Sequence, residues 1–123
     1  MMESKDILVV DDQPGVRLLL KEMFTNEGYC VTTAETGKEA LDSLYARSFD
    51  LLMLDYKLPV VDGVQVLEQL ERDRMHIPSI IMSGMIEDIE KVSEQFSMVK
   101  EVIGKPFDVE NVCTSTKGLL GTN

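Results

Sequence analysis

The 123-residue chain has no tryptophan, one histidine and two cysteines. The cysteines, Cys30 and Cys113, form no CxxC pair, so the sequence predicts neither a disulfide framework nor a zinc site. We expect both to be free thiols in a reducing compartment. The single histidine, His76, lies close to Pro78 in an expected surface loop, where we expect its side chain to be solvated.

Long apolar runs are absent as well. No run approaches the roughly 20 residues that a membrane-spanning helix needs, and the N-terminal stretch MMESKD lacks the apolar region of a signal peptide. We therefore expect a cytoplasmic protein with no membrane segment.

Positive charge is scarce. The chain has 12 Lys and Arg residues against 22 Asp and Glu residues, which gives a formal net charge of -10. An acidic protein binds nucleic acid and anionic membranes poorly, so we expect neither as a partner. A cation site and a basic protein partner remain open.

The residues that are present indicate one globular domain over residues 1–123, because 44% are hydrophobic and the length suits a single core. Short apolar runs alternate with segments of helical spacing. Pro14 suits the first turn of a helix, and Gly28 would end it. The apolar residues between them recur at helical intervals: Val16, Leu19, Leu20, Met23 and Phe24. The expected strands are 7–10, 29–34, 51–54, 80–82 and 102–103.

Capping signals separate these strands from the helices that follow. Thr36 with Glu39 forms a capping box, Asp62 with Gln65 resembles another, and Asp108 caps the last helix. Strands joined by helices predict an α/β, doubly wound fold, with a parallel sheet and helices on both of its faces.

Charged and hydroxyl side chains follow the strands of this expected sheet. Asp11 and Asp12 come after the first strand, Asp55 after the third, Ser83 after the fourth and Lys105 after the fifth. Ligands bind at the carboxyl ends of strands in such sheets, so we expect these side chains to meet at one edge. Adjacent carboxylates repel one another and need a positive partner.

Three clustered carboxylates form an oxygen-only site that suits Mg²⁺. A carboxylate can also attack phosphorus and form an aspartyl phosphate. A metal ion and Lys105 would neutralise the phosphoryl oxygens, and Ser83 could donate a hydrogen bond to one of them.

The motifs VVDDQPG, LDYKLPVVDG, IIMSG and GKPF resemble, in order, those of the receiver domain of two-component response regulators. The stretches DDQ, LLLKE, NEGY, LPVVDG and KPFD are similar to the single-domain phosphorelay intermediate of endospore-forming bacteria. The resemblance implies a (βα)5 fold with strand order 2-1-3-4-5 and a single domain without an output domain.

The resemblance also implies roles for the site residues. Asp55 would accept the phosphoryl group, Asp12 would bind Mg²⁺ directly, and Asp11 would help to hold it. The backbone carbonyl of Lys57 would be a further metal ligand, and the Lys105–Pro106 bond would be cis. Ser83 and Lys105 would contact the phosphoryl group.

The implied function is phosphoryl transfer between proteins rather than enzyme turnover. A sensor histidine kinase would phosphorylate Asp55, and a histidine phosphotransferase would receive the group in a relay that controls sporulation. We expect a monomer that loses its phosphoryl group slowly by itself. The partner would dock on residues that surround the site: Gln13, Pro14, Gly15, Leu18, Pro59, Met85 and Phe107.

One position departs from the family pattern. Receivers often carry an aromatic residue three positions before the lysine, and that residue turns inward on phosphorylation. This chain has Val102 there. The resemblance therefore does not extend to the usual switch between a hydroxyl and an aromatic residue.

Other classes fit less well. A phosphatase of the haloacid-dehalogenase kind would separate its two acids by one residue, and a flavodoxin-like carrier would need a Ser/Thr/Gly-rich loop in place of DDQPG. A receiver fold that is never phosphorylated would not need all the acids and the lysine. The alternative within the family is a stand-alone receiver that binds a target protein when it is phosphorylated.

Overall fold

The computed structural model describes residues 4–121, apart from the side chains of residues 86–89. Strands and helices alternate along this range. The strands are β1 (Asp6–Val10), β2 (Cys30–Ala34), β3 (Leu51–Asp55), β4 (Ser79–Ser83) and β5 (Val99–Gly104). The helices are α1 (Pro14–Asn26), α2 (Gly37–Ala46), α3 (Gly63–Arg72), α4 (Ile86–Gln95) and α5 (Val109–Leu120).

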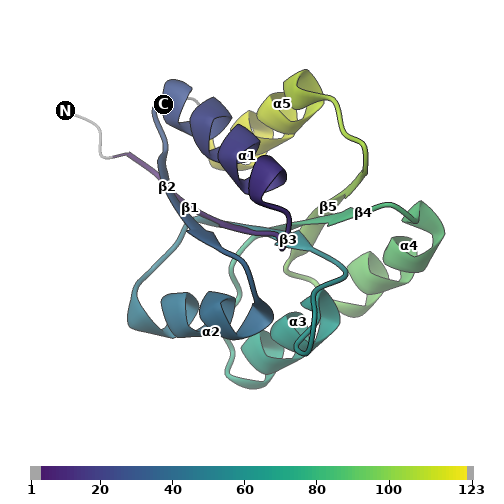
Figure 1. Cartoon of the computed structure of the whole chain (residues 1–123). Helices are drawn as coiled ribbons and strands as arrows, with labels where there is room; N and C mark the ends of the chain where they lie inside the picture. The colour runs from purple at the N-terminus through teal and green to yellow at the C-terminus, as the bar shows by residue number, and fades with distance from the viewer. Residues whose placement is uncertain (1–3, 122–123) are drawn as a thin grey trace.

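The strands form one parallel sheet in the order β2-β1-β3-β4-β5. Helices α1 and α5 cover one face, and α2, α3 and α4 cover the other (Figure 1). The predicted doubly wound (βα)5 fold and its strand order are therefore confirmed. None of the helices within residues 4–121 combines the length and the apolar character needed to cross a membrane.

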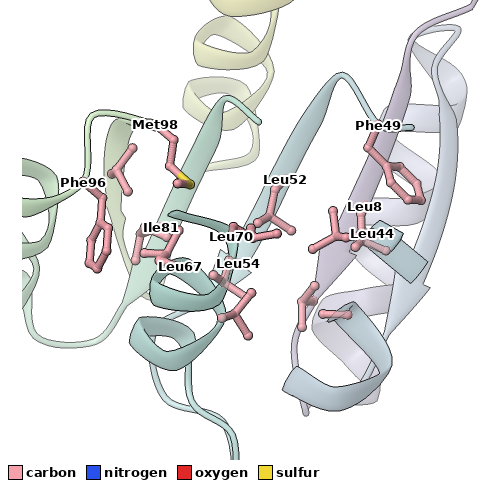
Figure 2. Packing of buried hydrophobic residues seen from close by; sticks show 14 of the residues in the cluster. Leu8, Leu44, Phe49, Leu52, Leu54, Leu67, Leu70, Ile81, Phe96 and Met98 are labelled. Atoms are coloured by element: carbon pink, nitrogen blue, oxygen red, sulfur yellow. The ribbon is translucent and has the colours of Figure 1, made fainter. Parts of the chain in front are cut away.

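The sheet separates two hydrophobic cores. Successive strand side chains point to opposite faces, so Ile7 and Val9 of β1 pack under α1 and α5, whereas Leu8 and Val10 pack against the other helices. Figure 2 shows this second core, where Leu52 and Leu54 of β3 meet the helical leucines. The inner strands are buried on both faces, which explains their uninterrupted apolar runs.

Two helix starts follow the expected capping chemistry in different ways. Asp62 and Gln65 form the complete reciprocal capping box at α3. At α2, the Thr36 hydroxyl accepts from the backbone N–H of Glu39, but the Glu39 carboxylate accepts from the N–H of Glu35 rather than from that of Thr36. The second hydrogen bond of the expected capping box, from the Thr36 N–H to Glu39, is therefore replaced by one from the N–H of the preceding residue, Glu35.

The last strand is longer than expected, because β5 covers Val99–Gly104 rather than residues 102–103. It lies at an edge of the sheet, where one side is open to water, so polar residues such as Lys100 can occupy it. Its Lys105–Pro106 junction has the expected cis peptide bond.

Gly63 allows α3 to begin directly on the backbone that carries Asp55. A Cβ atom at Gly63 would lie 2.7 Å from the carbonyl oxygen of Asp55 and 3.0 Å from that of Tyr56. The N–H of Gly63 donates to the Tyr56 carbonyl at 3.0 Å. Any larger side chain at this position must displace the end of β3.

The same glycine-to-alanine substitution should therefore change the free energy of unfolding in opposite directions at Gly63, which is crowded, and at Gly118, which is not. Gly63→Ala should lower the free energy of unfolding by about 1–3 kcal/mol through overpacking. Gly118→Ala should raise it by roughly 0.5–1 kcal/mol, since Gly118 lies inside α5 and a Cβ atom there would have nothing within 4 Å to clash with. Urea unfolding of both variants measures the difference, and a Gly63→Ala protein as stable as the parent would contradict the close approach.

Candidate functional site

The sheet register brings the predicted site residues to its carboxyl edge. Asp11 follows β1, Asp55 ends β3, Ser83 ends β4, and Lys105 follows β5. Ser83 pairs with Gly104 in the parallel register, and the backbone N–H of Lys105 donates to the Ser83 carbonyl at 2.7 Å. Four strand ends thus place acidic, hydroxyl and ammonium groups in one region.

Lys105 joins two buried carboxylates. Its Nζ atom lies 2.6 Å from Oδ2 of Asp11 and 3.3 Å from Oδ2 of Asp55. Asp11 is fully buried, Asp55 is 6% exposed, and the side chain of Lys105 is 18% exposed. The ammonium group therefore supplies positive charge to the acids, as their mutual repulsion requires.

Asp11 and Asp12 differ in how they are held. The second oxygen of Asp11, Oδ1, accepts from the backbone N–H of Gln13 at 2.9 Å, so both oxygens of this carboxylate are engaged. Asp12 is exposed to solvent. The Asp11 carboxylate is therefore buried and held by hydrogen bonds, whereas that of Asp12 faces water.

The three acids form a candidate cation site. One carboxylate oxygen each from Asp11, Asp12 and Asp55 lies within 4.8 Å of the other two. An oxygen-only set with one solvent-facing member suits Mg²⁺, which keeps several waters among its ligands. Lys57, the expected carbonyl ligand, lines a pocket together with Asp12 and Asp62. The residues present therefore fit the metal.

Burial and charge shift two pKa values in this cluster. Burial, together with the nearby charge of Asp11, raises the pKa of Asp55, and Lys105 and the Lys57 N–H only partly oppose this. Burial alone would lower the pKa of Lys105, but its bonds to Asp11 and the charges of Asp11 and Asp55 raise it overall. Lys105 is therefore an ammonium group at neutral pH.

Ser83 lies at the same edge but is bonded within its own loop. Its hydroxyl oxygen accepts from the backbone N–H of Met85 at 3.0 Å, and the side chain is almost fully buried. A contact between this hydroxyl and a phosphoryl group remains a prediction. Val102, at the position where receivers often have an aromatic residue, is half-buried and packs against the core under α3 and α4.

Most residues of the expected docking surface are exposed. Leu18 is 58% exposed and Met85 is 55% exposed. The others exposed are Gln13, Pro14, Gly15 and Pro59. Phe107 is half-buried because it packs against the core under α1 and α5.

Two residues of α1 were not anticipated from the sequence. Leu19, expected on the buried stripe, is 43% exposed and lines a groove between α1 and α5. Arg17 reaches back to the site, where its Nη1 atom donates to the backbone carbonyl of Asp11 at 2.8 Å. A single arginine on a helix carries no sequence signal that would have predicted this contact.

Comparison with known proteins agrees with this geometry. The family described as "Response regulator receiver domain" matches residues 7–117. The chain therefore belongs to the response regulator receiver domain family, and the resemblance seen in its motifs is confirmed.

Two curated relatives differ in how much of their own length this chain covers. "Sporulation initiation phosphotransferase F" of Bacillus subtilis (strain 168) is 36% identical over 121 residues, which cover 97% of this chain and 96% of that protein. "Alkaline phosphatase synthesis transcriptional regulatory protein PhoP" of the same organism is 33% identical over 117 residues, 95% of this chain. The chain spans about half of the length of PhoP, 49%.

Solved structures show the same fold. The response regulator protein TrrA of Thermotoga maritima, in complex with Mg²⁺-BeF, superposes with a TM-score of 0.83 at 32% identity and covers 94% of this chain and 98% of that one. A Francisella response regulator receiver domain gives a TM-score of 0.86 at 27% identity, with 94% and 96% coverage.

The raised pKa of Asp55 predicts how stability depends on pH. The folded protein holds the Asp55 proton more tightly than the unfolded chain, so metal-free stability should fall as pH rises from the ordinary carboxyl value of 3.8 through the raised one. Asp55→Asn removes this loss, and we expect a gain of about 1 kcal/mol at pH 7 that shrinks toward pH 3.5.

Urea unfolding in a metal chelator between pH 3.5 and 7 measures this effect. Asp42→Asn, at an exposed position on α2, is the control for an acid-to-amide change outside the site. An Asp55→Asn protein that is less stable than the parent at pH 7 would show that the Lys105 ion pair outweighs burial.

Proposed function

We propose that this chain is a phosphorelay intermediate. It accepts a phosphoryl group on Asp55 from the phosphohistidine of a sensor histidine kinase and passes it to a histidine of a phosphotransferase. The observation that carries the proposal is the buried Asp55 carboxylate, ion-paired with Lys105 and clustered with those of Asp11 and Asp12.

In the first transfer, an oxygen of the Asp55 carboxylate attacks phosphorus. The new O–P bond forms as the N–P bond of the phosphohistidine breaks, and the histidine nitrogen leaves with its electron pair. The reverse exchange with a second histidine completes the relay. Lys105 holds its positive charge beside Asp55 and stabilises the phosphoryl oxygens.

We assign the cation site to Mg²⁺, with Asp12 as a direct ligand, Asp11 as its support and the carbonyl of Lys57 as a further ligand. When bound, the metal ion supplies positive charge that offsets the repulsion between an anionic nucleophile and an anionic phosphoryl group. Ser83 would donate a hydrogen bond to a phosphoryl oxygen in place of its 3.4 Å hydrogen bond to the Met85 carbonyl, while its oxygen still accepts from the Met85 N–H.

The relay and its control of sporulation are supported by the similarity to sporulation initiation phosphotransferase F, which extends over nearly the full length of both chains. The two free cysteines, Cys30 and Cys113, suit the reducing cytoplasm in which such a relay would operate.

Slow self-dephosphorylation is part of the proposal, because a carrier must keep its group until it meets the second protein. Lys57, two residues after Asp55, and Met85, two residues after Ser83, are both exposed beside the site. A lysine ammonium accepts no hydrogen bond and a thioether accepts only weakly. Neither can orient and deprotonate a water molecule for attack on phosphorus.

Labelling experiments test the function. With acetyl phosphate and Mg²⁺, intact-mass analysis should show one phosphoryl adduct that requires the metal and is absent in Asp55→Asn. With a phosphorylated kinase and a phosphotransferase, the label should pass through this chain to the second histidine. An adduct that persists in Asp55→Asn would refute the assignment of Asp55 as the phosphoryl acceptor. A label that stays on this chain would favour phosphorylation-dependent binding to a target instead.

The docking surface gives a second prediction. A partner histidine must approach Asp55 in line, so its helix must contact the surroundings of the site: Gln13, Pro14, Gly15, Leu18, Pro59, Met85 and Phe107. Leu18→Ala should slow transfer from the kinase about tenfold or more if Leu18 anchors the interface, since truncating an anchoring side chain costs about 2 kcal/mol or more and about 1.4 kcal/mol is tenfold. Labelling by acetyl phosphate should not change.

Leu19→Ala is the matched control, because it makes the same change on the adjacent residue of α1, which lines the groove toward α5. Equal slowing by both variants would contradict a contact specific to Leu18. Loss of acetyl phosphate labelling in Leu18→Ala would indicate damage to the fold rather than to docking.

A further inference from the structure

Arg17 connects the site to the neighbouring loop from within α1. Its Nη1 atom donates to the backbone carbonyl of Asp11 at 2.8 Å, and its Nη2 atom lies 3.4 Å from Oε2 of Glu35, which follows β2. The Arg17 side chain is only 19% exposed. A guanidinium group can hold two acceptors at once because its donors form a rigid fork.

The carbonyl that Arg17 contacts belongs to the peptide between Asp11 and Asp12. The preceding peptide is also fixed, since the N–H of Asp11 donates to the carbonyl of Ala34 at 3.1 Å. The backbone is therefore held on both sides of Asp11. Because the orientation of the second peptide sets the direction in which the Asp12 side chain leaves the backbone, Arg17 acts on Asp12 without touching its carboxylate.

This support is more important for Asp12 than for Asp11. The Asp11 carboxylate is anchored by Gln13 and Lys105, whereas Asp12 is exposed and depends on its backbone for direction. A metal ion requires its ligands at defined positions, and partners behind the ligands commonly set those positions.

We propose that Arg17 is a positioning residue for the cation site: through the Asp11 carbonyl and Glu35, it fixes the peptide that aims Asp12 at the metal ion. This inference rests on the Mg²⁺ site of the proposed function. It gives α1 a part in metal binding in addition to its part in the proposed docking surface, to which Leu18 belongs.

Charge and positioning predict opposite results when Arg17 is replaced. If Arg17 acted only through its positive charge, it would repel Mg²⁺, and removing it would strengthen metal binding. If it positions Asp12, removing it weakens metal binding although the site becomes more negative. The sign of the change therefore separates the two roles.

Two variants and one control exploit this difference. Arg17→Met removes the charge and the hydrogen bonds, whereas Arg17→Lys keeps the charge but cannot hold both acceptors with a fork. Arg47→Lys is the matched control, because Arg47 pairs with Asp6 at 2.6 Å where β1 begins, at the opposite edge of the sheet.

Calorimetric titration with Mg²⁺ measures the dissociation constant of each protein. We expect both Arg17 variants to bind Mg²⁺ about tenfold more weakly than the parent, and Arg47→Lys to bind as the parent does. In metal-free protein, amide hydrogen exchange followed by NMR should be faster at Asp12 and Gln13 in both Arg17 variants, with strand amides unchanged.

Unchanged affinity in Arg17→Lys, or tighter binding in Arg17→Met, would overturn the positioning role while leaving the Mg²⁺ site intact. Accelerated exchange throughout the sheet would also overturn it, because Arg17 would then support the fold in general. A parent protein that binds no Mg²⁺ would overturn the proposed function and this inference together.

Discussion

The ion pair of Lys105 with Asp11 and Asp55 is the interaction on which the carboxyl edge of the sheet depends. Without it, two buried carboxylates would face each other with little water to screen them. The lysine comes from the end of β5 and the acids from β1 and β3, so one ammonium group joins three strand ends. A phosphoryl group on Asp55 would place new negative charge beside the same ammonium group. The charge that surrounds Lys105 would therefore differ between the phosphorylated and unphosphorylated protein.

The side chains and the backbone of the site are each held by neighbouring residues. Lys105 and the Gln13 N–H orient the Asp11 side chain, while Arg17 and Ala34 hold its backbone. Gly63 brings α3 against the backbone of Asp55. These contacts come from both sides of the sheet, so the reactive edge is supported by α1 on one side and α3 on the other. Such support holds the Asp11 and Asp55 carboxylates in fixed relative positions.

Much of this arrangement could be predicted from the sequence, because buried parallel strands leave apolar runs and the runs of β1, β3 and β4 lead directly into Asp11, Asp55 and Ser83. Strand order and the meeting of the site residues followed from that pattern together with the family resemblance. The ends of β5 could not be predicted, since an edge strand tolerates polar residues such as Lys100. Leu19 had helical spacing but faces a groove, and the contact of Arg17 depends on where a long side chain folds back. Neither property is encoded in residue type or spacing.

The two cores share the strands that separate them. Each inner strand contributes alternate side chains to both, so removing either layer of helices would expose one face of β1, β3 and β4 to water. Loss of either layer therefore weakens the packing that holds these strands, although the two cores lie on opposite faces of the sheet. The two cores are therefore coupled through the strands that they share. In the proposed function, a phosphoryl group would be added at the end of a strand, β3, that both helical layers hold in place.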